Sequence, residues 1–438
     1  MTAGHFDALV VGAGPAGSIA ATVLARGGAR VALVDKAKFP RDKACGDLVG
    51  PRGVQVLTDL GIPIRGAIAV GDMNVVGPTT RRVRLPCFPG RTYPGYALAV
   101  PRVDFDAELH EVAVEAGAEA FIDRAAEPLW GDDGLSGFSL STGTELRADI
   151  IIGADGASSR VATAADLVDR TRVLWGFALR AYVDEHVDLP HIVLWERTPW
   201  RAFPGYGWMF PGPDGRANLG LGIGTLSSRE GAATVARDLP AFVRTLRGLG
   251  LLGSAAPMRT LGGWLKLGMV GTNPARGRVL LVGDAAGLVN PLQGEGISQA
   301  MTSGRAAAEA ALADPARAAR GYRAYLANTY APYHSTTAPL HRALLPRPRV
   351  VSWVARVVTA PTVGALVAPA WSIFWNDLLD GAQPTVPRAV AALAARIGRI
   401  ATAGGQMRHW FTATLGEGSY RSADTTRRCP DALDHGSA

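Results

Sequence analysis

The sequence predicts an α/β protein in which a discontinuous Rossmann-type nucleotide-binding domain is interrupted by a β-sheet domain and followed by a helical region. Residues 5–36 have the pattern of a strand, a glycine-rich turn, an alanine-rich helix and a second strand. A further apolar strand, Val279–Val282, leads into a helix that we expect to begin near Pro291. Segments rich in β-branched residues, proline and glycine separate these two units, and helical patterns replace them after about residue 320.

These patterns divide the chain into four parts. The nucleotide-binding domain is predicted to comprise residues 1–66, 100–172 and 268–320. The inserted β-sheet domain, which we expect to hold the substrate, comprises residues 67–99, read as strands of a second sheet, and 173–267. The helical region is predicted at 321–411 and a disordered polar tail at 412–438. Shorter elements are expected as helices at 51–60, 103–116 and 236–247 and as a strand–hairpin–strand unit that ends at Ile150–Gly153.

The composition is that of a folded protein with a sizeable core. Hydrophobic residues make up 48% of the 438 residues and charged residues 19%. The net charge is +7, and all but four of the 45 basic residues are arginine. No run of basic residues is interleaved with aromatic ones, so nucleic-acid binding is not expected. A basic surface suits an anionic membrane or a diphosphate-bearing substrate better.

The cysteines point to a reducing compartment. Cys45, Cys87 and Cys429 form no Cys-x-x-Cys pair and no metal-ligand spacing, so neither a metal site nor an iron–sulfur cluster is expected. The first apolar run, Ala8–Val11, already belongs to a strand and follows no basic segment, which argues against a signal peptide. We therefore expect a cytoplasmic protein.

The C-terminal helices raise the question of membrane contact. The apolar stretch Val350–Trp375 is interrupted by Arg356, Pro361 and Pro369, which favours buried or interfacial helices over a membrane span. A helix over residues 387–411 would be amphipathic. Its apolar face would hold Val390, Leu393, Ile397 and Ile400, and the opposite face Arg388, Arg396 and Arg399. It fits either an ordinary surface helix or a helix lying on the inner face of the cell membrane.

The first chemical motif is a phosphate-binding turn. Gly12 permits a tight turn, Gly14 lets the backbone approach a pyrophosphate, and Gly17 allows close packing of helix and strand. The phosphates would lie at the helix N-terminus, near Ala16, where free N–H groups favour anions. Asp35, followed by Lys36, ends the second strand, and its carboxylate can accept both ribose hydroxyls. An acid there disfavours a 2′-phosphate, so the motif predicts FAD or NAD.

The second motif decides between these two cofactors. Gly283 and Asp284 follow the late apolar strand, where a carboxylate can bind a ribityl hydroxyl. The segment that comes next places backbone N–H groups at a helix start, where they can face the flavin and stabilise its anionic reduced form. The residues of that segment with a predicted role are Pro291, Gly294, Gly296 and Ile297. NAD has no use for a second, distant segment, so the sequence predicts bound FAD.

The third motif, Asp155-Gly156, also follows a predicted strand. Arg102, at the start of a helix that contains Asp104 and Asp106, is a candidate FAD contact, although a solvated arginine at a helix start explains it equally well. With the other two motifs, Asp155-Gly156 resembles the flavoprotein group typified by para-hydroxybenzoate hydroxylase, over roughly residues 5–320. In that group the three segments together hold one FAD. The arginine that usually continues the Asp-Gly motif would fall at Ala162, so the nicotinamide contact of that arginine is not carried over.

Within this group the chain is similar to the geranylgeranyl reductase family. Lys43-Ala44-Cys45-Gly46-Asp47 resembles its Lys-x-Cys-Gly segment near the flavin, although Leu48 stands where glycine is common. Tyr206-Gly207-Trp208-Met209-Phe210-Pro211 resembles its Tyr-x-Trp-x-Phe-Pro signature, and Gly294-Glu295-Gly296-Ile297 its helix-start segment. The resemblance implies reduction of isolated C=C bonds in polyprenyl chains, and the actinobacterial menaquinone-type branch is the most similar in character.

The resemblance also implies roles for individual residues. Tyr206, Trp208 and Phe210 alternate on a strand and would form a flat aromatic wall for an isoprenoid chain, unless that face is simply core. Cys45 would lie near the flavin as a proton donor or polarity-setting group, unless it is a small buried apolar residue. Reduced FAD would deliver hydride from N5 to one alkene carbon. The electron donor is expected to be NADPH or a reduced protein or quinol carrier, and the sequence predicts no oligomeric state.

Three rival functions use the same features. A flavin-dependent monooxygenase shares the fold and the cofactor, and only the signature at Tyr206–Pro211 argues against it. A flavin-dependent halogenase has a similar signature, but no lysine occurs between Lys43 and Lys266 to serve as its catalytic lysine. A non-catalytic prenyl-lipid carrier would have little need for three flavin segments.

Overall fold

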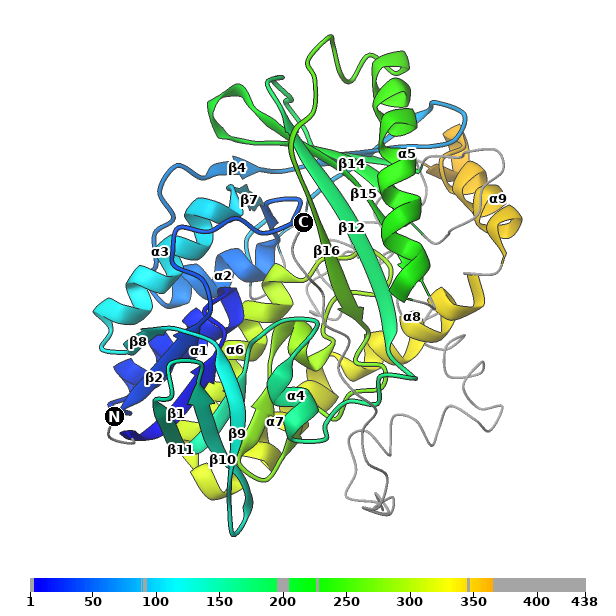
Figure 1. Ribbon diagram of the computed structural model, residues 1–438. Coiled ribbons are helices and arrows are strands. Elements are labelled where there is room, and N and C mark those ends of the chain that lie inside the picture. The colour runs from blue at the N-terminus through cyan, green and yellow to red at the C-terminus, as the bar shows by residue number, and fades with distance from the viewer. Residues whose placement is uncertain are drawn as a thin grey trace.

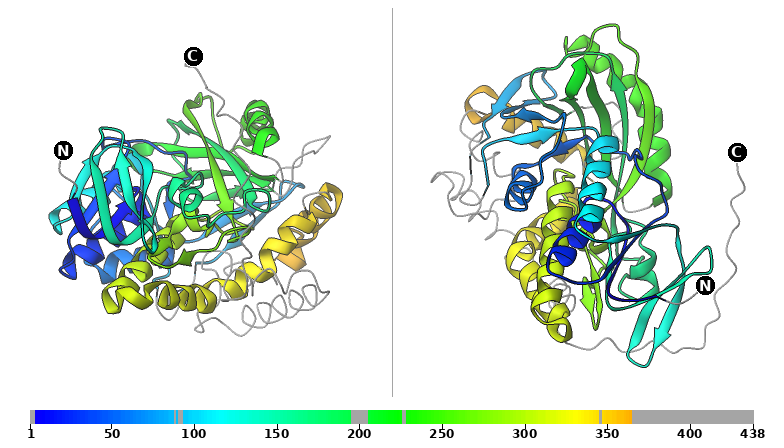
Figure 2. Two further views of the ribbon diagram at one scale, coloured as in Figure 1. Left: turned by 60° about the horizontal axis from the view of Figure 1, so that its bottom comes forward. Right: turned by 90° about the vertical axis from the view of Figure 1, so that its left-hand side faces the viewer.

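The computed structural model describes residues 4–87, 89, 93–194, 205–225, 228–344 and 347–364 of the chain. A mostly parallel sheet with helices against it lies in the lower half of the molecule as drawn in Figure 1, and a second, long-stranded sheet rises above it. Figure 2 shows the same two parts from below and from the side.

The lower sheet has eight strands and is parallel at its centre. Its path runs β17-β18-β11-β1-β2-β8, and the antiparallel strands β10 and β9 extend from β11. Ala8–Val11 and Ile150–Ile152 are buried, which is why these central strands are continuous apolar runs. The strand bounds are β1 Gly4–Val11, β2 Val31–Asp35, β8 Glu119–Ile122, β9 Ala125–Gly131, β10 Gly134–Leu140, β11 Glu145–Gly153, β17 Ala275–Arg276 and β18 Val279–Leu281.

Two long helices, α1 and α6, pack against each other beside this sheet (Figure 1). Their close approach depends on Gly304, because a Cβ there would lie 2.2 Å from the backbone oxygen of Ala16. The helices of this part are α1 Pro15–Arg26, α2 Pro51–Asp59, α3 Arg102–Glu115, α4 Arg160–Ala164, α6 Ile297–Ala313 and α7 Ala318–Thr329. Short 3₁₀ turns occur at Pro213–Gly215, Gly283–Ala286 and Pro315–Arg317.

The prediction that a helix begins near Pro291 is wrong, since α6 begins at Ile297. The Asn290 side chain accepts the backbone N–H groups of Leu292 and Gln293, which holds the intervening residues in a turn. Gly294 then has a φ of 70°, a left-handed conformation that ends any helical geometry there. The Glu295 carboxylate accepts the backbone N–H of Ser298 and so marks the true start of the helix.

The upper sheet has seven strands in the order β16-β12-β15-β14-β13-β5-β6. Only β13 and β5 pair in parallel. One face is covered by helix α5, Ser228–Gly248, whose Phe242 ring fills the space where Gly207 has no side chain. The other face is turned toward the eight-stranded sheet and its helices (Figure 2). The strand bounds are β5 Met73–Val76, β6 Arg82–Leu85, β12 Leu174–Val183, β13 His191–Val193, β14 Gly205–Pro211, β15 Ala217–Thr225 and β16 Met258–Leu267.

A small third sheet corrects the interpretation of residues 67–99 as one set of strands. β7, Ala97–Ala99, pairs on one side with β3, Leu48–Val49, and on the other with β4, Ile68–Val70, whereas β5 and β6 join the seven-stranded sheet. The cause is β3, which directly follows the predicted Cys-Gly segment and gives β7 an antiparallel partner. The division of the chain into domains stays a prediction.

The C-terminal part continues through α8, Ala331–Leu344, and α9, Pro348–Val358. These helices, yellow to orange in Figure 1, lead from α7 toward β5 and the edge strand β6, where the side chain of Thr359 fills the space beside Gly77. In the part of the chain that the structure describes, no helix is both long and apolar enough to cross a membrane. The predicted helix at 387–411, the tail at 412–438, the end of the Val350–Trp375 stretch and Cys429 lie outside the described residues.

Candidate functional site

The three sequence motifs meet at one edge of the eight-stranded sheet. The glycine turn follows β1, the Asp-Gly segment follows β11, and the Gly-Asp segment follows β18, and these parallel strands are neighbours in the sheet. Asp35 ends β2, on the other side of β1. The carboxyl ends of parallel strands are where open α/β sheets bind ligands, because loops leave and helices begin there.

The glycine turn has the geometry of a phosphate cradle. Gly12 has a φ of 103°, and a Cβ there would lie 2.4 Å from the Ala154 carbonyl oxygen. A Cβ at Gly17 would lie 1.7 Å from the Gly12 carbonyl oxygen, so this position requires glycine for packing. The space beside Gly14 holds only the Arg41 guanidinium, 3.6 Å from the Cβ position. No side chain caps the start of α1, so its N–H groups are available to an anion.

Asp35 contacts this turn directly. Its Oδ2 accepts the backbone N–H of Ala13 at 2.8 Å, and its Oδ1 accepts the N–H of Ala37 at 2.9 Å. The carboxylate is therefore fixed next to the phosphate cradle, as the ribose prediction requires. The neighbouring Lys36 side chain is exposed.

The Gly-Asp segment packs onto the first motif. A Cβ at Gly283 would lie 3.3 Å from the Ala16 methyl group, so the predicted Ala16 contributes by letting the two segments approach. The Asp284 carboxylate lies 3.7 Å from the Cβ position of Gly296, at the start of α6. Ile297 is buried in the core, and the carbonyl of the buried Pro291 accepts a hydrogen bond from His341 Nδ1. The carboxylate and the helix start thus face each other, as one bound flavin would need.

Asp155 has a different immediate role. Its carboxylate accepts the Ser159 hydroxyl and the backbone N–H groups of Arg160 and Val161. It therefore caps helix α4 and fixes the turn that contains Gly156, whose φ is 81°. Burial raises the pKa of Asp155, and these hydrogen bonds act in the opposite direction.

Arg102 is part of a buried ion-pair network that the sequence alone did not reveal. Its guanidinium donates two hydrogen bonds of 2.6 Å to the Asp106 carboxylate, and both side chains are buried. Arg41 makes a 2.8 Å ion pair with the same carboxylate. Asp106 thereby holds Arg41 beside Gly14, at the phosphate cradle. Arg41 is a candidate phosphate ligand, and the only available signal was its position shortly after β2.

Cys45 and Gly46 lie between the start of α6 and strand β14. Cys45 is half-buried and packs against the apolar cluster that contains Ile19 and Ile297. A Cβ at Gly46 would lie 3.0 Å from the Phe210 ring, so the backbone of this segment rests on the aromatic strand. Burial raises the pKa of the Cys45 thiol, which outweighs the opposite effect of the Arg102 charge.

Tyr206, Trp208 and Phe210 share one face of β14, but they do not form the flat wall that the alternation predicts. Neighbouring ring centroids are 6.2 Å apart, with interplanar angles of 62° for Tyr206–Trp208 and 28° for Trp208–Phe210. Trp208 and Phe210 are buried against small residues, Gly220 and Gly46 respectively. Tyr206 is half-buried, and its hydroxyl donates to the Gln293 carbonyl, next to Gly294. The structure thus brings Tyr206 to the Gln293–Gly294 loop and makes the other two rings part of the packing.

Two lysines of the four differ sharply in environment. Lys43 is half-buried, and its backbone N–H donates to the Asp42 side chain. Lys266, on β16, is 1% exposed, and its ammonium donates to the Ala285 carbonyl beneath the Gly-Asp segment. Burial lowers the pKa of Lys266 to about 8, while the charges of Asp155 and Asp284 act in the opposite direction. The buried environment of Lys266 depends on contacts between distant segments, so the sequence alone did not identify it.

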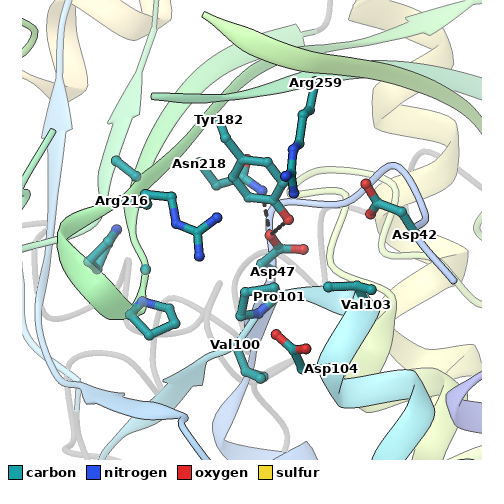
Figure 3. A pocket seen from close by; sticks show the side chains of 14 residues that line it. Asp42, Asp47, Val100, Pro101, Val103, Asp104, Tyr182, Arg216, Asn218 and Arg259 are labelled. Atoms are coloured by element: carbon teal, nitrogen blue, oxygen red, sulfur yellow. Dashed lines mark hydrogen bonds between the residues drawn. The ribbon is translucent and has the colours of Figure 1, made fainter. Parts of the chain in front are cut away.

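A cavity of about 390 Å³ opens between α3 and the turn that joins β14 to β15. Asp47, Tyr182 and Asn218 form its inner wall, and Arg216 and Arg259 project into it (Figure 3). No residue of the glycine turn or of the Gly-Asp segment is among its lining residues. Among the described residues no cluster of histidine, cysteine, aspartate or glutamate has the geometry of a metal site.

The fold and the cradle define an FAD-dependent oxidoreductase. A family model described as an FAD binding domain matches residues 5–180. A menaquinone reductase of Mycolicibacterium smegmatis is 36% identical over 315 residues, which are 69% of this chain and 75% of that protein. A menaquinone reductase of Mycobacterium tuberculosis is 33% identical over 398 residues, 87% of this chain and 94% of that protein.

More distant relatives carry related names. A geranylgeranyl diphosphate reductase of Rhodobacter capsulatus is 34% identical over 333 residues, 70% of this chain and 75% of that protein. The chain belongs to the geranylgeranyl reductase family, which confirms the resemblance inferred from the motifs.

Solved structures confirm the fold. A geranylgeranyl bacteriochlorophyll reductase-like protein from Thermoplasma acidophilum superposes with a TM-score of 0.71 at 23% identity, covering 90% of this chain and 100% of that one. The flavin-dependent brominase Bmp2 superposes with a TM-score of 0.66 at 18% identity, covering 91% of this chain and 98% of that one. Both likenesses concern the architecture, an α/β protein with a nucleotide-binding sheet and a second sheet beside it.

Proposed function

We propose that this protein reduces C=C bonds of a polyprenyl substrate, with FAD as its cofactor. The observation that carries the proposal is the convergence of three segments. Tyr206 contacts the Gln293–Gly294 loop, Cys45 packs in the cluster that contains Ile297, and Gly46 lies against Phe210. These contacts bring together around one site the family's aromatic strand, its cysteine segment and its helix-start segment.

The cofactor would be held by the residues at the sheet edge. The pyrophosphate would lie on Gly14 at the start of α1 with Arg41 beside it, and the ribose on Asp35. The ribityl chain would contact Asp284, and the flavin ring the N–H groups at Gly296 and Ile297. The other cofactor-binding residues of this proposal act through turn geometry or packing: Gly12, Ala16, Gly17, Lys36, Lys43, Gly46, Arg102, Asp155, Gly156, Gly283, Pro291 and Gly294.

Bound FAD supplies the hydride, and the chain's own residues orient the alkene, exclude water and provide the proton. An unactivated alkene is a poor hydride acceptor, so orientation contributes heavily to such a reaction. Tyr206 would orient the chain, Trp208 would support it from within the packing, and Cys45 would hold a proton at its sulfur. Because burial raises its pKa, this thiol remains protonated at neutral pH.

The substrate class follows from the relatives. Proteins at 33–36% identity are named for menaquinone, and others at 28–34% for geranylgeranyl diphosphate or digeranylgeranylglycerophospholipid. All of these molecules carry polyprenyl chains. We propose a menaquinone side chain as the first substrate to test, with the electrons supplied by NADPH or by a reduced protein or quinol carrier.

A lipid substrate makes peripheral membrane contact part of the proposal, with the protein at the cytoplasmic face. Helix α9 exposes three apolar side chains at helical spacing, Val350, Trp353 and Val354. It also contains Arg349 and Arg356 and no acidic residue. Apolar and aromatic side chains flanked by arginine suit a helix that lies on an anionic lipid surface.

The deciding experiment uses the FAD-loaded protein under anaerobic conditions. After reduction with dithionite, a menaquinone or geranylgeranyl diphosphate is added. We expect the flavin to reoxidise without oxygen and the product to gain two mass units per reduced double bond. A flavin that stays reduced with every polyprenyl substrate until oxygen is admitted would contradict the proposal and favour a monooxygenase. Repeating the reduction with NADPH in place of dithionite tests the electron donor.

A further inference from the structure

We propose that Asn218 and Asp47 are positioning residues that lock the Cys45–Gly46 segment onto the aromatic strand β14. Asn218 lies on β15 and Asp47 directly precedes β3, far away in the sequence, and neither is among the cofactor-binding residues named above. The inference rests on the proposed function for its kinetic part alone.

Asn218 uses its whole amide group in this lock. Its Oδ1 accepts the indole N–H of Trp208 at 2.9 Å. Its Nδ2 donates at 2.8 Å to two acceptors, the Cys45 carbonyl and Asp47 Oδ2. Asn218 is 2% exposed, so water does not compete for these bonds. One side chain therefore fixes the indole ring and the cysteine segment relative to each other.

Asp47 completes the lock from the opposite side. Its Oδ2 also accepts the Tyr182 hydroxyl at 2.6 Å, and its Oδ1 accepts the backbone N–H of Arg102 at 3.2 Å. Its backbone has a φ of 59°, a left-handed conformation that is uncommon for residues other than glycine but that aspartate adopts more readily than most. The carboxylate is thus held by strand β12, by Asn218 of β15 and by the start of α3.

The residues around these hydrogen bonds are closely packed. The Phe210 ring fills the space beside Gly46, and the Trp208 ring lies 2.3 Å from where a Gly220 Cβ would be. If Asn218 released the segment that contains Cys45, this cysteine would move relative to the Trp208 ring, which Asn218 also holds. Such a shift matters because displacement of a reacting group by about 1 Å can cost about a hundredfold in rate.

The hydrogen bonds of Asn218 and Asp47 lie beside the cavity of Figure 3. Several charged side chains surround the Asp47 carboxylate there. Arg180 and Arg102 face the carboxylate from β12 and α3, and Cys45 and Asp42 from its own segment. Arg216, Arg259 and Asp104 line the cavity beyond it, so the carboxyl group lies at the buried end of this cavity. The protonation state of Asp47 therefore bears on the lock.

The first test measures the segment without any substrate. In the FAD-loaded protein, the rate at which a maleimide labels Cys45 is followed by peptide mass spectrometry, with Cys87 as an internal reference. We expect Asn218→Ala to raise the Cys45 rate about tenfold, because the segment loses the hydrogen bonds that the Asn218 amide donates to the Cys45 carbonyl and to Asp47 and therefore opens more often. Asn74→Ala is the matched control, since Asn74 is a half-buried asparagine of the same sheet that bonds to His191.

The second test separates positioning from mere stability. Asn218→Asp retains the shape and the acceptor for Trp208 but turns the donor into an oxygen that faces Asp47. We expect its kcat for alkene reduction to fall at least tenfold at pH 8 and to recover partly below pH 6, with FAD affinity and KM little changed. The double variant Asp47→Asn with Asn218→Asp restores the donor–acceptor pair and should regain part of the loss.

Two outcomes would overturn the inference. One is a Cys45 labelling rate in Asn218→Ala equal to that of the wild type or of Asn74→Ala. The other is a loss of kcat in Asn218→Asp that is independent of pH and not relieved in the double variant. A protein with no alkene reductase activity would refute the proposed function, while the labelling result would still decide the lock.

Discussion

The hydroxyl of Tyr182 donates a 2.6 Å hydrogen bond to Asp47, which ties strand β12 of the seven-stranded sheet to the segment that carries Cys45. Burial raises the pKa of Asp47 to about 6, although the hydrogen bonds from Tyr182 and Asn218 and the charges of Arg180 and Arg102 act in the opposite direction. The loss of water around the carboxylate therefore outweighs four stabilising interactions.

This raised pKa makes the stability of the protein depend on pH. Between pH 3.8, the ordinary pKa, and about 6, the folded state binds more protons than the unfolded state, so stability falls as pH rises through that window. The contribution of Asp47 is on the order of 3 kcal/mol. We expect Asp47→Asn to remove this fall, so that its free energy of unfolding, relative to wild type, increases from pH 4.5 to 7. Asp104→Asn, an exposed acid of the same cavity, should show no such trend in urea unfolding.

Lys266 contributes a pH dependence of stability with the opposite sign to that of Asp47. Its pKa is lowered from 10.5 to about 8 by burial, so between these pH values the unfolded state binds more protons and stability rises with pH. The expected rise from Lys266 is roughly 3 kcal/mol over this whole window, of which about 2 kcal/mol falls between pH 7.5 and 9.5. Lys266→Met should abolish it, whereas Lys38→Met, at an exposed lysine, should retain it. Urea unfolding at pH 7.5 and 9.5 measures both, and an unchanged rise in Lys266→Met would show that the amine is not desolvated as described.

Two glycines of the phosphate turn should separate cofactor binding from folding. A side chain at Gly14 meets only the end of the flexible Arg41, so Gly14→Val should fold normally but occupy the phosphate position. A methyl group at Gly17 would collide with the Gly12 carbonyl, so Gly17→Ala should destabilise the fold by about 3 kcal/mol or more. We expect Gly14→Val to purify colourless with a wild-type circular dichroism spectrum. Yellow, FAD-loaded Gly14→Val protein would contradict the assignment of this turn.

The geometry of the glycine turn and its neighbouring carboxylates was predictable from the sequence because its signals are local. Gly12, Gly14 and Gly17 each answer a backbone requirement within one turn, and Asp35 and Asp284 each follow an apolar strand. Once these strands are taken as parallel neighbours, the meeting of the motifs at one sheet edge follows. The start of α6 was misplaced because the side chain of Asn290 and the left-handed Gly294 decide it, and a helical pattern does not report these.

The remaining site residues depend on contacts between distant segments. Asn218 on β15 contacts Trp208 on the neighbouring strand and the distant loop that contains Cys45, and Gly304 is explained only by the Ala16 backbone on another helix. Alternation correctly placed Tyr206 and Trp208 on one face, but it does not report how each ring turns or what covers it. Arg41 required the buried Asp106 to hold it at the phosphate turn.

The last prediction concerns helix α9 and the lipid surface. Trp353 is 64% exposed and is flanked on the same helix by the exposed Val350 and Val354. Burial of such a side chain in a lipid interface is worth about 1.5–3 kcal/mol, so Trp353→Ser should weaken binding to anionic vesicles about tenfold or more. Trp130→Ser is the matched control, because Trp130 is 58% exposed but lies on β9 of the nucleotide-binding sheet. Co-sedimentation with vesicles of phosphatidylglycerol and phosphatidylethanolamine measures both variants. Equal binding by wild type and Trp353→Ser would exclude α9 as the membrane contact, and equal weakening by both variants would indicate a nonspecific loss of surface hydrophobicity.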